Sequence, residues 1–489
     1  MRLKDLIKDL SYKKAENLQD AEITGVGVNS HTVSPGYLFV AVKGERLDGH
    51  NFVPEAIAKG ARAVVIEKDL PLSASVAKIV VADTRAALIK LCAAFFEHPA
   101  EKLNNVGITG TNGKTTVSYL IETMLGYAGY KSGVIGTINY RVAGKNYPAT
   151  NTTPGADILH RFLREIVSAQ AKYAIIEVSS HALEQKRTSG IRFQSAIFTN
   201  LSAEHLDYHK TMANYFTAKA RLFRALDKKA WAIVNTDDAY GRKLVKITKA
   251  QVLTYGLAHV ADIQAQGLTL DVRGSRFTVR TPQGSFLVNT PLIGEHNIYN
   301  ILAAIGFACA EHLDMTPVLV ALKSFNGTPG RLERVECGQD FAVFIDYAHT
   351  DAALKIVLDT VRRLSPGRVI VVFGCGGDRD KQKRPRMGKV ATERADSVII
   401  TCDNPRSEKP EQIVNDILKG ISAKKHNYTV VLDRYAAIRE ALTQAEVNDV
   451  VVIAGKGHEN VQIFAERTVA FSDRSCTEEI LKCLPLAKS

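Results

Sequence analysis

Residues 105–116 read Asn-Val-Gly-Ile-Thr-Gly-Thr-Asn-Gly-Lys-Thr-Thr, and this stretch decides the fold. Its first part, residues 105–109, has the short apolar and β-branched character of a buried strand. The segment beyond it, residues 117–125, places apolar side chains at helical spacing. A glycine-bearing turn between a buried strand and a helix is typical of parallel α/β architecture. We therefore expect an α/β fold in this part of the chain.

The turn itself has the chemistry of a phosphate site. Gly110 and Gly113 let backbone N–H groups turn inward around phosphate oxygens, and the helix behind them presents its positive N-terminus. Lys114 should reach the β- and γ-phosphates of ATP, and Thr115 should bind Mg²⁺. The strict P-loop pattern has Gly where this chain has Ile108, so the loop is a variant of that pattern.

Polar loops also follow six other apolar runs, at residues 173–178, 196–199, 341–345, 369–373, 397–401 and 450–453. Ligands in open α/β sheets bind beyond the carboxyl ends of the strands. The recurrence therefore predicts two groups of ligand-binding loops, one that ends near His209 and one that begins near Gly330.

The chain length of 489 residues suggests about three domains. We predict a small N-terminal α/β domain, a central P-loop-type mononucleotide-binding α/β domain and a C-terminal Rossmann-like α/β domain. Their predicted limits are residues 1–100, 101–331 and 332–489. Between the two groups of loops lie further strand signals, at residues 252–255, 277–280 and 285–289.

Composition excludes several classes of protein. The net charge of +12 comes from dispersed Lys and Arg rather than from basic runs with interleaved aromatics, so we expect phosphates and carboxylates as ligands and no nucleic acid. No apolar run approaches the ~18 residues of a membrane helix. The seven cysteines have no CxxC spacing, which indicates free thiols in a cytoplasmic protein and disfavours a zinc site.

The first group of loops carries two candidate metal ligands. Glu177 ends a predicted strand and is a direct or indirect Mg²⁺ ligand, or else a capping or solvated carboxylate. His205 lies in the polar run Glu-His-Leu-Asp-Tyr-His, which suits a metal site but is also common at the start of a helix. The residues alone leave these alternatives open.

The second group of loops begins with residues that suit contact with a nucleotide. Asp346 starts the run Asp-Tyr-Ala-His-Thr and suits nucleotide contact or acid–base work, or the N-cap of a helix. Arg331 either binds a phosphate or pairs with the neighbouring Glu333. Cys375 lies in a glycine loop, and we predict that it takes no part in the chemistry.

Further along, the loops suit the charged head of an amino acid. Arg406 follows Asp403, Asn404 and the turn-forming Pro405, and can bind a carboxylate in bidentate fashion. Arg379 supplies a second cation, and Glu459, four residues after Gly455, a carboxylate for an ammonium group. Each residue alone is explained as well by a surface salt bridge, but together they predict a site for a zwitterion.

At this point the sequence resembles the Mur ligase family over essentially the whole chain. The motifs, in family order, are Thr-Gly-Thr-Asn-Gly-Lys-Thr-Thr (109–116), Glu-Val-Ser-Ser-His (177–181), His-Asn-x-x-Asn (296–300), Gly-Arg-Leu-Glu (330–333) and Asp-Tyr-Ala-His-Thr (346–350). Asp-Asn-Pro-Arg (403–406) and Gly-Lys-Gly-His-Glu (455–459) resemble the branch that adds meso-diaminopimelate to UDP-N-acetylmuramoyl-L-alanyl-D-glutamate (UDP-MurNAc-L-Ala-D-Glu) in peptidoglycan synthesis. Lysine-adding relatives differ at the Arg position.

The resemblance implies a role for each matching residue. Lys114, Glu177, His205 and Lys219 are catalytic by this comparison; Lys219 matches a lysine that is carbamylated in the family, and Thr115, Glu177 and His205 serve Mg²⁺. The implied ATP contacts are Gly110, Thr111, Asn112, Gly113, Lys114, Thr115, Thr116, Asn297, Arg331 and Asp346. The implied contacts to the UDP precursor are Ser30, Asn151, Thr152, Thr153, Ser179, Gln185 and Arg187. The implied amino-acid contacts are Arg379, Asp403, Asn404, Pro405, Arg406, Gly455 and Glu459.

The implied reaction is ATP-dependent formation of an amide through an acyl phosphate, and we expect a monomer that acts on small molecules and not at a membrane. His349 and Asp346 are candidates for the base that deprotonates the amine. Other ligases are rivals: a lysine-adding Mur ligase, or a folylpolyglutamate synthase-like enzyme, which should lack the first domain. A P-loop switch or motor protein would leave the second group of loops unexplained, and a non-catalytic nucleotide sensor would bind nucleotide without releasing ADP.

Overall fold

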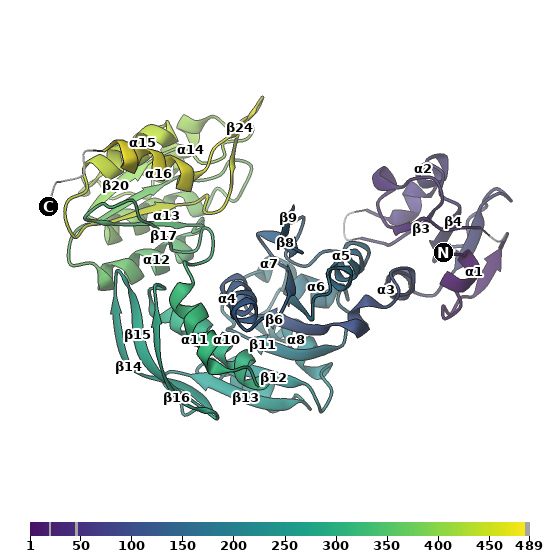
Figure 1. The fold of residues 1–489 in the computed structure, drawn as a ribbon. Coiled ribbons are helices and arrows are strands. Elements are labelled where there is room, and N and C mark those ends of the chain that lie inside the picture. The colour runs from purple at the N-terminus through teal and green to yellow at the C-terminus, as the bar shows by residue number, and fades with distance from the viewer. Residues whose placement is uncertain (19–20, 45–46, 485–489) are drawn as a thin grey trace. The chain divides into compact units, whose positions relative to one another are not determined.

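The computed structural model describes residues 1–18, 21–44 and 47–484. The chain divides into two compact units (Figure 1), and each is described here by itself. The first unit comprises Met1–Gln264 and Leu302–Val318, and the second comprises Ala265–Ile301 and Leu319–Ser489.

The first unit begins with a five-stranded sheet in the order β1-β5-β4-β3-β2. Its strands are β1 (Lys14–Glu16), β2 (Gly25–Gly27), β3 (Tyr37–Val40), β4 (Ala63–Ile66) and β5 (Ala77–Val80), and its helices are α1 (Leu3–Leu6), α2 (Val53–Ala58) and α3 (Thr84–Phe95). Alternate strand residues serve two cores: Val65 packs with α1 and α3, and Val64 with α2. Both faces are therefore covered, as is usual for parallel strands.

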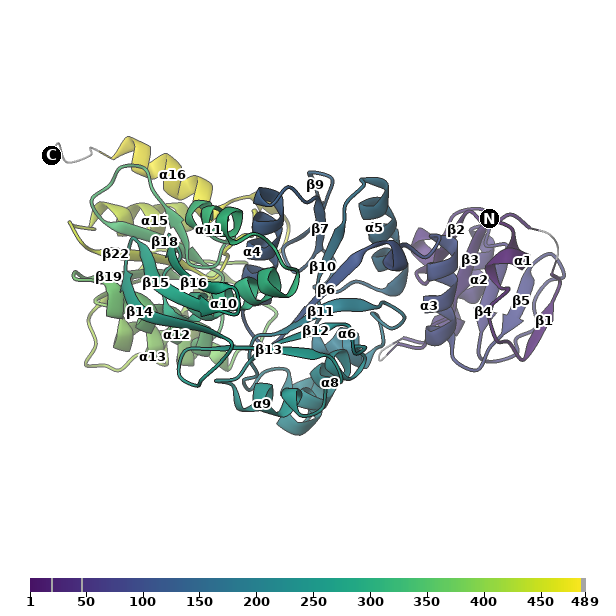
Figure 2. The same cartoon turned by 60° about the horizontal axis from the view of Figure 1, so that its bottom comes forward.

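The central strands of the first unit have the order β13-β12-β11-β6-β10-β7-β8-β9. Figure 2 shows β10, β6 and β11 running side by side. The registers place Glu177 opposite Ile108 and Phe198 opposite Thr109, so the carboxyl ends of these three parallel strands meet at one edge. The strands are β6 (Asn104–Thr109), β7 (Ser132–Ile135), β8 (Asn139–Val142), β9 (Lys145–Pro148), β10 (Tyr173–Glu177), β11 (Phe193–Phe198), β12 (Trp231–Asn235) and β13 (Gln251–Gly256).

Helices cover this central sheet. Phe162 of α5 and Phe223 of α8 share a core with Ile176 and Phe198 from the strands. The helix α4 begins directly at Lys114, because Gly113 occupies its N-cap in the left-handed conformation (φ 88°). The helices are α4 (Lys114–Tyr127), α5 (Ala156–Ser168), α6 (Ser180–Glu184), α7 (Leu206–His209), α8 (Met212–Arg224) and α9 (Ala239–Val245).

The boundary between the two units falls within β14 (Ile263–Asp271), α10 (Glu295–Ala310) and α11 (Met315–Ser324). In the second unit, β15 (Gly274–Thr281) and β16 (Gly284–Thr290) form an antiparallel hairpin. This region contains the strand signals at 277–280 and 285–289, and the structure confirms both.

The rest of the second unit is a doubly wound domain with strand order β17-β18-β22-β19-β20-β21. Val371 and Phe373 pack with α12, α13 and α14, whereas Ile370 and Val372 pack with α15 and α16. The strands are β17 (Glu333–Val335), β18 (Ala342–Asp346), β19 (Val369–Phe373), β20 (Ser397–Ile400), β21 (Tyr428–Val430) and β22 (Val450–Ala454), with a separate hairpin of β23 (Val461–Ile463) and β24 (Thr468–Ala470). The helices are α12 (Asp351–Leu364), α13 (Lys383–Arg394), α14 (Pro410–Leu418), α15 (Arg434–Thr443) and α16 (Asp473–Cys483).

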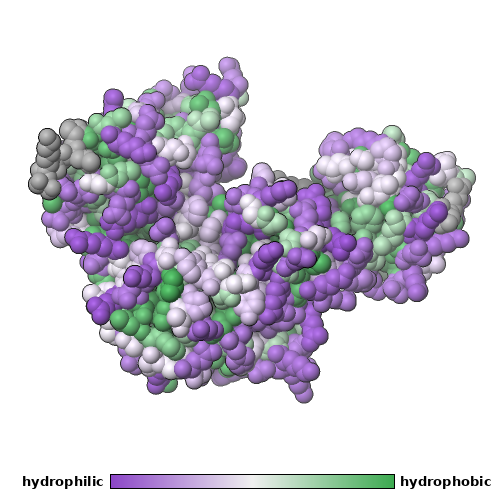
Figure 3. Space-filling view, in the orientation of Figure 1, coloured by the Kyte–Doolittle hydropathy of each residue, from purple (hydrophilic) through white to green (hydrophobic). Residues whose placement is uncertain are grey.

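All seven apolar runs that precede the predicted loops are strands, with ends that shift by a few residues. The α/β fold class predicted from the sequence is therefore confirmed. Most of the face in Figure 3 is hydrophilic, with hydrophobic residues in small scattered groups. In the part of the chain that the structure describes, the helices are too short or too polar to traverse a bilayer.

Candidate active site

The phosphate loop is held in shape by the loop that follows β11. The N–H groups of Thr111 and Asn112 donate to the carbonyl and side-chain oxygens of Asn200, at 2.9 and 3.0 Å. A Cβ atom at Gly110 would lie 1.8 Å from Oγ1 of Thr199, so the loop tolerates only glycine there. The close approach that the sequence predicted for Gly110 is therefore present, although its contact, the loop after β11, was not foreseen.

Two lysines converge on this loop. Nζ of Lys114 donates to the carbonyl oxygens of Gly110 and Thr111, at 3.0 and 2.8 Å. Nζ of Lys219, from α8, donates to the same Gly110 oxygen at 2.8 Å. The two amines thus share one acceptor, and their positive charges repel each other if both are protonated.

Lys219 is 1% exposed and has no carboxylate within salt-bridge distance in the described residues. Burial lowers the pKa of its amine well below the ordinary value, and the charge of Lys114 lowers it further. Its Nζ also lies 4.7 Å from the ring centroid of Tyr215. Desolvation therefore shifts Lys219 towards the neutral amine, whereas the Gly110 carbonyl and the Tyr215 ring are contacts that an ammonium group can also make.

Glu177 is buried at the end of β10 and accepts hydrogen bonds from three residues. Its Oε2 accepts from Oγ1 of Thr115 at 3.0 Å and from Oγ1 of Thr137 at 2.8 Å. Its Oε1 accepts from the N–H of Thr137 at 3.1 Å and from Oγ of Ser118 at 3.4 Å. Glu177 is thus neither a helix cap nor a solvated carboxylate, so both alternatives to a role at Mg²⁺ are wrong.

The Thr115 hydroxyl and the Glu177 carboxylate fit Mg²⁺. That ion prefers oxygen ligands, usually keeps several waters and takes few protein ligands besides the phosphates of a nucleotide. Among the residues that the structure describes, no cluster of three His, Cys, Asp or Glu side chains suits a metal ion. The donor set therefore suits an ion that a nucleotide helps to hold, not a closed structural site.

His205 lies at the N-cap of α7 with a left-handed backbone (φ 57°). This position agrees with a polar helix start, one of the two interpretations that the sequence left open. Burial lowers the pKa of the His205 imidazole, and the positive charges of Lys114 and Lys219 lower it further. Its ring centroid lies 5.0 Å from that of His181. A metal-binding role for His205 stays a prediction.

Three of the residues predicted to contact the UDP precursor line a cavity of about 420 Å³. Ser30, Gln185 and Arg187 all line it. Ser30 is buried, and its hydroxyl donates to Glu55 at 2.8 Å. The lining that sequence reasoning missed includes Arg85, Asp157, Leu88 and Ile89, none of which lies in a motif identified from the sequence.

The other predicted precursor contacts lie between this cavity and Glu177. Oγ1 of Thr152 lies 3.1 Å from Oγ1 of Thr137, which binds Glu177. Oγ1 of Thr153 donates to the Glu177 carbonyl at 2.7 Å, and its carbonyl accepts from Arg187 at 2.7 Å. Ser179 caps α6, and the Asn151 carbonyl accepts from the Tyr140 hydroxyl. The predicted set is therefore contiguous.

In the second unit, Asp346 is the last residue of β18 and is buried. Its oxygens accept the N–H groups of Leu332 and Ala348, at 2.7 and 2.8 Å. Burial raises the pKa of this carboxyl, and the nearby charge of Arg331 opposes the increase. The helix-cap alternative is wrong, because Thr350 caps α12.

Arg331 places its guanidinium 5.2 Å from the ring centroid of Tyr347. The proposed pairing of Arg331 with Glu333 is wrong, because Glu333 instead binds the Arg474 guanidinium and the N–H of Gly330. Asn297 is buried in the first turn of α10, where its side chain contacts the Ile293 carbonyl and the Asn300 amide.

Arg406 and Arg379 approach the same glycine. Nη1 of Arg406 donates to the Gly377 carbonyl at 2.9 Å. A Cβ atom at Gly376 would lie 3.0 Å from that Nη1 and 3.8 Å from Cγ of Arg379. Arg406 has the left-handed backbone (φ 51°), a conformation that non-glycine residues adopt at an energetic cost and that often marks a binding site. Both side chains thus reach this glycine loop, where the Arg379 guanidinium donates to the Asp378 carbonyl at 3.2 Å.

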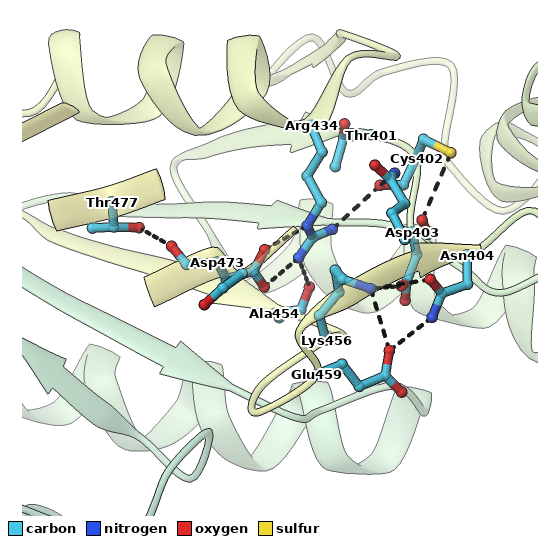
Figure 4. A network of polar contacts seen from close by, with 12 residues as sticks. Thr401, Cys402, Asp403, Asn404, Arg434, Ala454, Lys456, Glu459, Asp473 and Thr477 are labelled. Carbon is cyan, nitrogen blue, oxygen red and sulfur yellow. Dashed lines mark hydrogen bonds and ion pairs between the residues drawn. The ribbon is translucent and has the colours of Figure 1, made fainter. Parts of the chain in front are cut away.

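Asp403, Asn404 and Glu459 belong to a buried polar network (Figure 4). The Asn404 amide donates to Oε2 of Glu459 at 2.7 Å, and its backbone carbonyl accepts from Nη1 of Arg406 at 3.4 Å. Asn404 therefore connects the predicted carboxylate-binding and ammonium-binding side chains. Gly455 (φ 113°) lies against Asp403, where a Cβ atom would approach its Oδ2 to 3.0 Å. Asp403 and Pro405 are themselves buried.

Several side chains that shape this site were not predicted. Arg384 is buried, binds Glu408 at 2.8 and 2.9 Å and donates to the Gly376 carbonyl, so it supports the glycine loop. Lys456 and Arg434 belong to the network around Asp403. Lys456 lies within a motif that the sequence did single out, whereas Arg434 and Arg384 carry no sequence signal. The Cys375 thiol is buried with its pKa raised to about 12, as suits a residue that takes no part in the chemistry.

Comparison with known proteins agrees with this geometry. Three family models match the chain: "Mur ligase family, catalytic domain" at residues 22–96, "Mur ligase middle domain" at residues 108–308 and "Mur ligase, glutamate ligase domain" at residues 330–457.

Two relatives carry the name UDP-N-acetylmuramoyl-L-alanyl-D-glutamate–2,6-diaminopimelate ligase. The protein from Aquifex aeolicus is 46% identical over 94% of each chain, and that from Syntrophomonas wolfei is 41% identical over 99% of each chain. A solved structure of a ligase with the same name is 32% identical, covers 99% of both chains and superposes with a TM-score of 0.72.

Proposed function

Because the chain belongs to the Mur ligase family, we propose that it joins meso-2,6-diaminopimelate to the γ-carboxylate of UDP-MurNAc-L-Ala-D-Glu with the conversion of ATP to ADP and phosphate. One observation carries the choice of amino acid: Asn404 connects Arg406, beside Arg379, to the partly exposed carboxylate of Glu459. The Arg406 guanidinium and the Glu459 carboxylate, with Asn404 between them in space, suit the carboxylate and the ammonium at the far end of diaminopimelate.

The first chemical step joins two anions. The γ-carboxylate attacks the γ-phosphorus of ATP, the bond to the β,γ-bridging oxygen breaks, and an acyl phosphate and ADP result. Lys114, whose amine now binds two loop carbonyls, moves its positive charge onto the phosphates. Thr115 and Glu177 would hold Mg²⁺, which supplies further neutralisation of phosphate charge when bound.

In the second step the amine attacks the acyl carbon, phosphate leaves and a proton is lost. Of the two candidate bases, His349 fits better than Asp346. Both oxygens of Asp346 already accept backbone N–H groups. His349 has a lowered pKa, mainly through desolvation, and its Nδ1 lies 2.9 Å from the Tyr347 carbonyl. A proton on Nδ1 would leave Nε2 free to accept one from the amine.

The surroundings of Lys219 suit carbamylation of its side chain, in which the neutral amine adds to CO₂ and releases a proton. Its pKa is lowered, so the reactive amine forms at lower pH than for an exposed lysine. The product is an anion, which replaces the repulsion between Lys219 and Lys114 by attraction. In this proposal the anion orders Lys114 and the phosphate loop through charge.

Removal of CO₂ and bicarbonate should therefore lower activity. The loss should shrink as the pH falls, because protonation of the amine then prevents carbamylation even when CO₂ is present. We expect a decrease of at least about tenfold, equivalent to 1.4 kcal/mol of transition-state stabilisation. Activity should return on addition of bicarbonate, and ¹³C-bicarbonate should give a carbamate NMR signal that is absent from Lys219→Met and present in Lys228→Met, an exposed-lysine control. Full activity without CO₂ at every pH would contradict the role.

The function is tested by the release of phosphate and the formation of product. Purified protein with Mg-ATP and UDP-MurNAc-L-Ala-D-Glu should release phosphate and form the UDP-tripeptide when meso-diaminopimelate is added, and much less when L-lysine is added. Equal turnover of both amino acids would indicate a lysine-tolerant ligase. Nucleotide binding without phosphate release would indicate a sensor, and turnover of a folate substrate instead would indicate the folylpolyglutamate-type alternative.

The same proposal gives the enzyme a cytoplasmic place in peptidoglycan synthesis, since ATP and UDP-linked precursors are cytoplasmic molecules. Its cysteines, at all seven positions, are free thiols, in keeping with that compartment. The proposed domain limits stay at 1–100, 101–331 and 332–489, in the same order as the family models matched at residues 22–96, 108–308 and 330–457.

A further inference from the structure

Lys456 is a buried lysine to which the reaction gives no role. It follows β22, its side chain has no exposed surface, and its ammonium points into the network shown in Figure 4. Nζ lies 3.0 Å from Oδ1 of Asn404, 3.2 Å from Oε2 of Glu459 and 3.6 Å from Oδ1 of Asp403. A buried ammonium is costly unless it is paired, so these three contacts determine where it lies.

The network around Lys456 contains two cations and three carboxyl groups. Arg434 and Lys456 are the cations, and Asp403, Glu459 and Asp473 carry the carboxyl groups. Arg434 and Asp473 form a bidentate pair at 2.7 Å with both side chains fully buried, so they neutralise each other. Lys456 is left beside Asp403 and Glu459.

Of the three carboxyl groups, that of Glu459 is the most exposed. The Asp403 side chain is 8% exposed and that of Asp473 is 0% exposed, whereas that of Glu459 is 30% exposed. Burial raises the pKa of Asp403 although Arg434 and Lys456 oppose the increase, which disfavours a negative charge at that position. Lys456 is therefore paired chiefly with Glu459, whose carboxylate is the one that an arriving ammonium group can reach.

Lys456 also acts on Arg406 through Asn404. Oδ1 of Asn404 accepts from Lys456 and from the N–H of Ile463 at 3.0 Å, and these two contacts fix the plane of the amide. The N–H of Arg406 donates to the Ile463 carbonyl at 3.0 Å. The left-handed turn that carries Arg406 is thus attached to the same side chain that Lys456 orients.

We propose that Lys456 is a positioning residue for amino-acid recognition: its buried ammonium fixes the Glu459 carboxylate and, through Asn404, the turn that carries Arg406. Lys456 therefore sets the spacing between the two charged groups that receive the amino acid. This inference rests on the proposed function, and it predicts a selective effect on the amino acid, because the side-chain contacts of Lys456 go to Asn404, Glu459 and Asp403, all in the amino-acid loops.

The test compares the KM values of the three substrates in full-length enzyme. In Lys456→Met, which keeps the length of the side chain and removes its charge, we expect KM for diaminopimelate to rise at least about tenfold while KM for ATP and for the UDP precursor stays within about twofold. Lys456→Gln keeps one donor towards Asn404 and should show a smaller rise. Lys389→Met is the matched control, since the Lys389 side chain is 66% exposed in the same unit and pairs with Glu393 at 3.9 Å.

Several results would overturn the proposal. An unchanged or lower KM for diaminopimelate would mean that Lys456 competes with the substrate ammonium instead of placing its partner. Equal increases for all three substrates, or failure of both variants to fold, would mean a purely structural role. If only Lys456→Met fails to fold, Lys456→Gln is judged by the selective rise in KM alone. The unchanged enzyme is assayed in parallel: its failure to form product would refute the proposed function, whereas normal product formation with unaffected variants refutes only this inference.

Discussion

Replacement of Lys114 by Met should lower kcat for ADP formation by about 10²–10³-fold, the usual effect of removing one charged donor from a transition state. The amine lies in the phosphate loop and donates to two backbone carbonyls there, at 2.8 and 3.0 Å, which places it where the phosphates of a nucleotide would bind. The measurement is ADP release in a coupled assay with saturating substrates.

The fold should survive this change, because Lys114 is only partly buried and Gly113 still starts α4. Thermal unfolding of the variant should therefore stay close to that of the unchanged protein. Lys131→Met, at an exposed position before β7, serves as the control and should keep normal turnover. If the Lys114 variant retained kcat within about fivefold, the loop would not be the place where phosphate charge is neutralised.

Replacement of Arg406 by Ala should weaken the use of diaminopimelate far more than that of ATP or the UDP precursor. Loss of one partner of a desolvated charge pair costs about 2–5 kcal/mol. At 1.4 kcal/mol per factor of ten, kcat/KM for diaminopimelate should fall by at least about thirtyfold. L-Lysine, which lacks the second carboxylate, should be affected little, so that the preference between the two amino acids shrinks.

Two further variants make this result specific. Arg406→Lys keeps the charge but loses the planar pair of donors, and it should recover only part of the activity. Arg363→Ala, on the exposed surface of α12, removes an arginine from the same unit and should have no effect. Equal losses for diaminopimelate and the UDP precursor in Arg406→Ala would show that the residue supports the domain and does not recognise the amino acid.

Sequence patterns were most informative where local chemistry is restrictive. The phosphate loop was predictable because only glycine fits at Gly110, and because a strand followed by this turn leads into a helix. The strands were predictable because residues of parallel strands are buried on both faces and read as continuous apolar runs. Arg406 was predictable because Pro405 marks a turn, although its left-handed backbone was not.

Contacts between distant segments could not be read in the same way. Glu177 and Thr137 are 40 residues apart and Lys219 and Gly110 are 109 residues apart, and only the packing of strands and helices brings each pair together. The same is true of Arg434 and Asp473, 39 residues apart, which form an ion pair buried beneath the amino-acid loops. The pairing suggested for Arg331 and Glu333 failed because Arg474, far along the chain, binds Glu333 instead.

By itself, the sequence therefore determined the α/β class, the phosphate loop and the identity of the charged groups at the strand ends, since these depend on residue type and on neighbours along the chain. Tertiary structure alone decided which charges are paired, which are buried and which remain open to a ligand. The reason is physical: the free energy of a charged group depends on its desolvation and on the charges packed against it, and both are set by the fold.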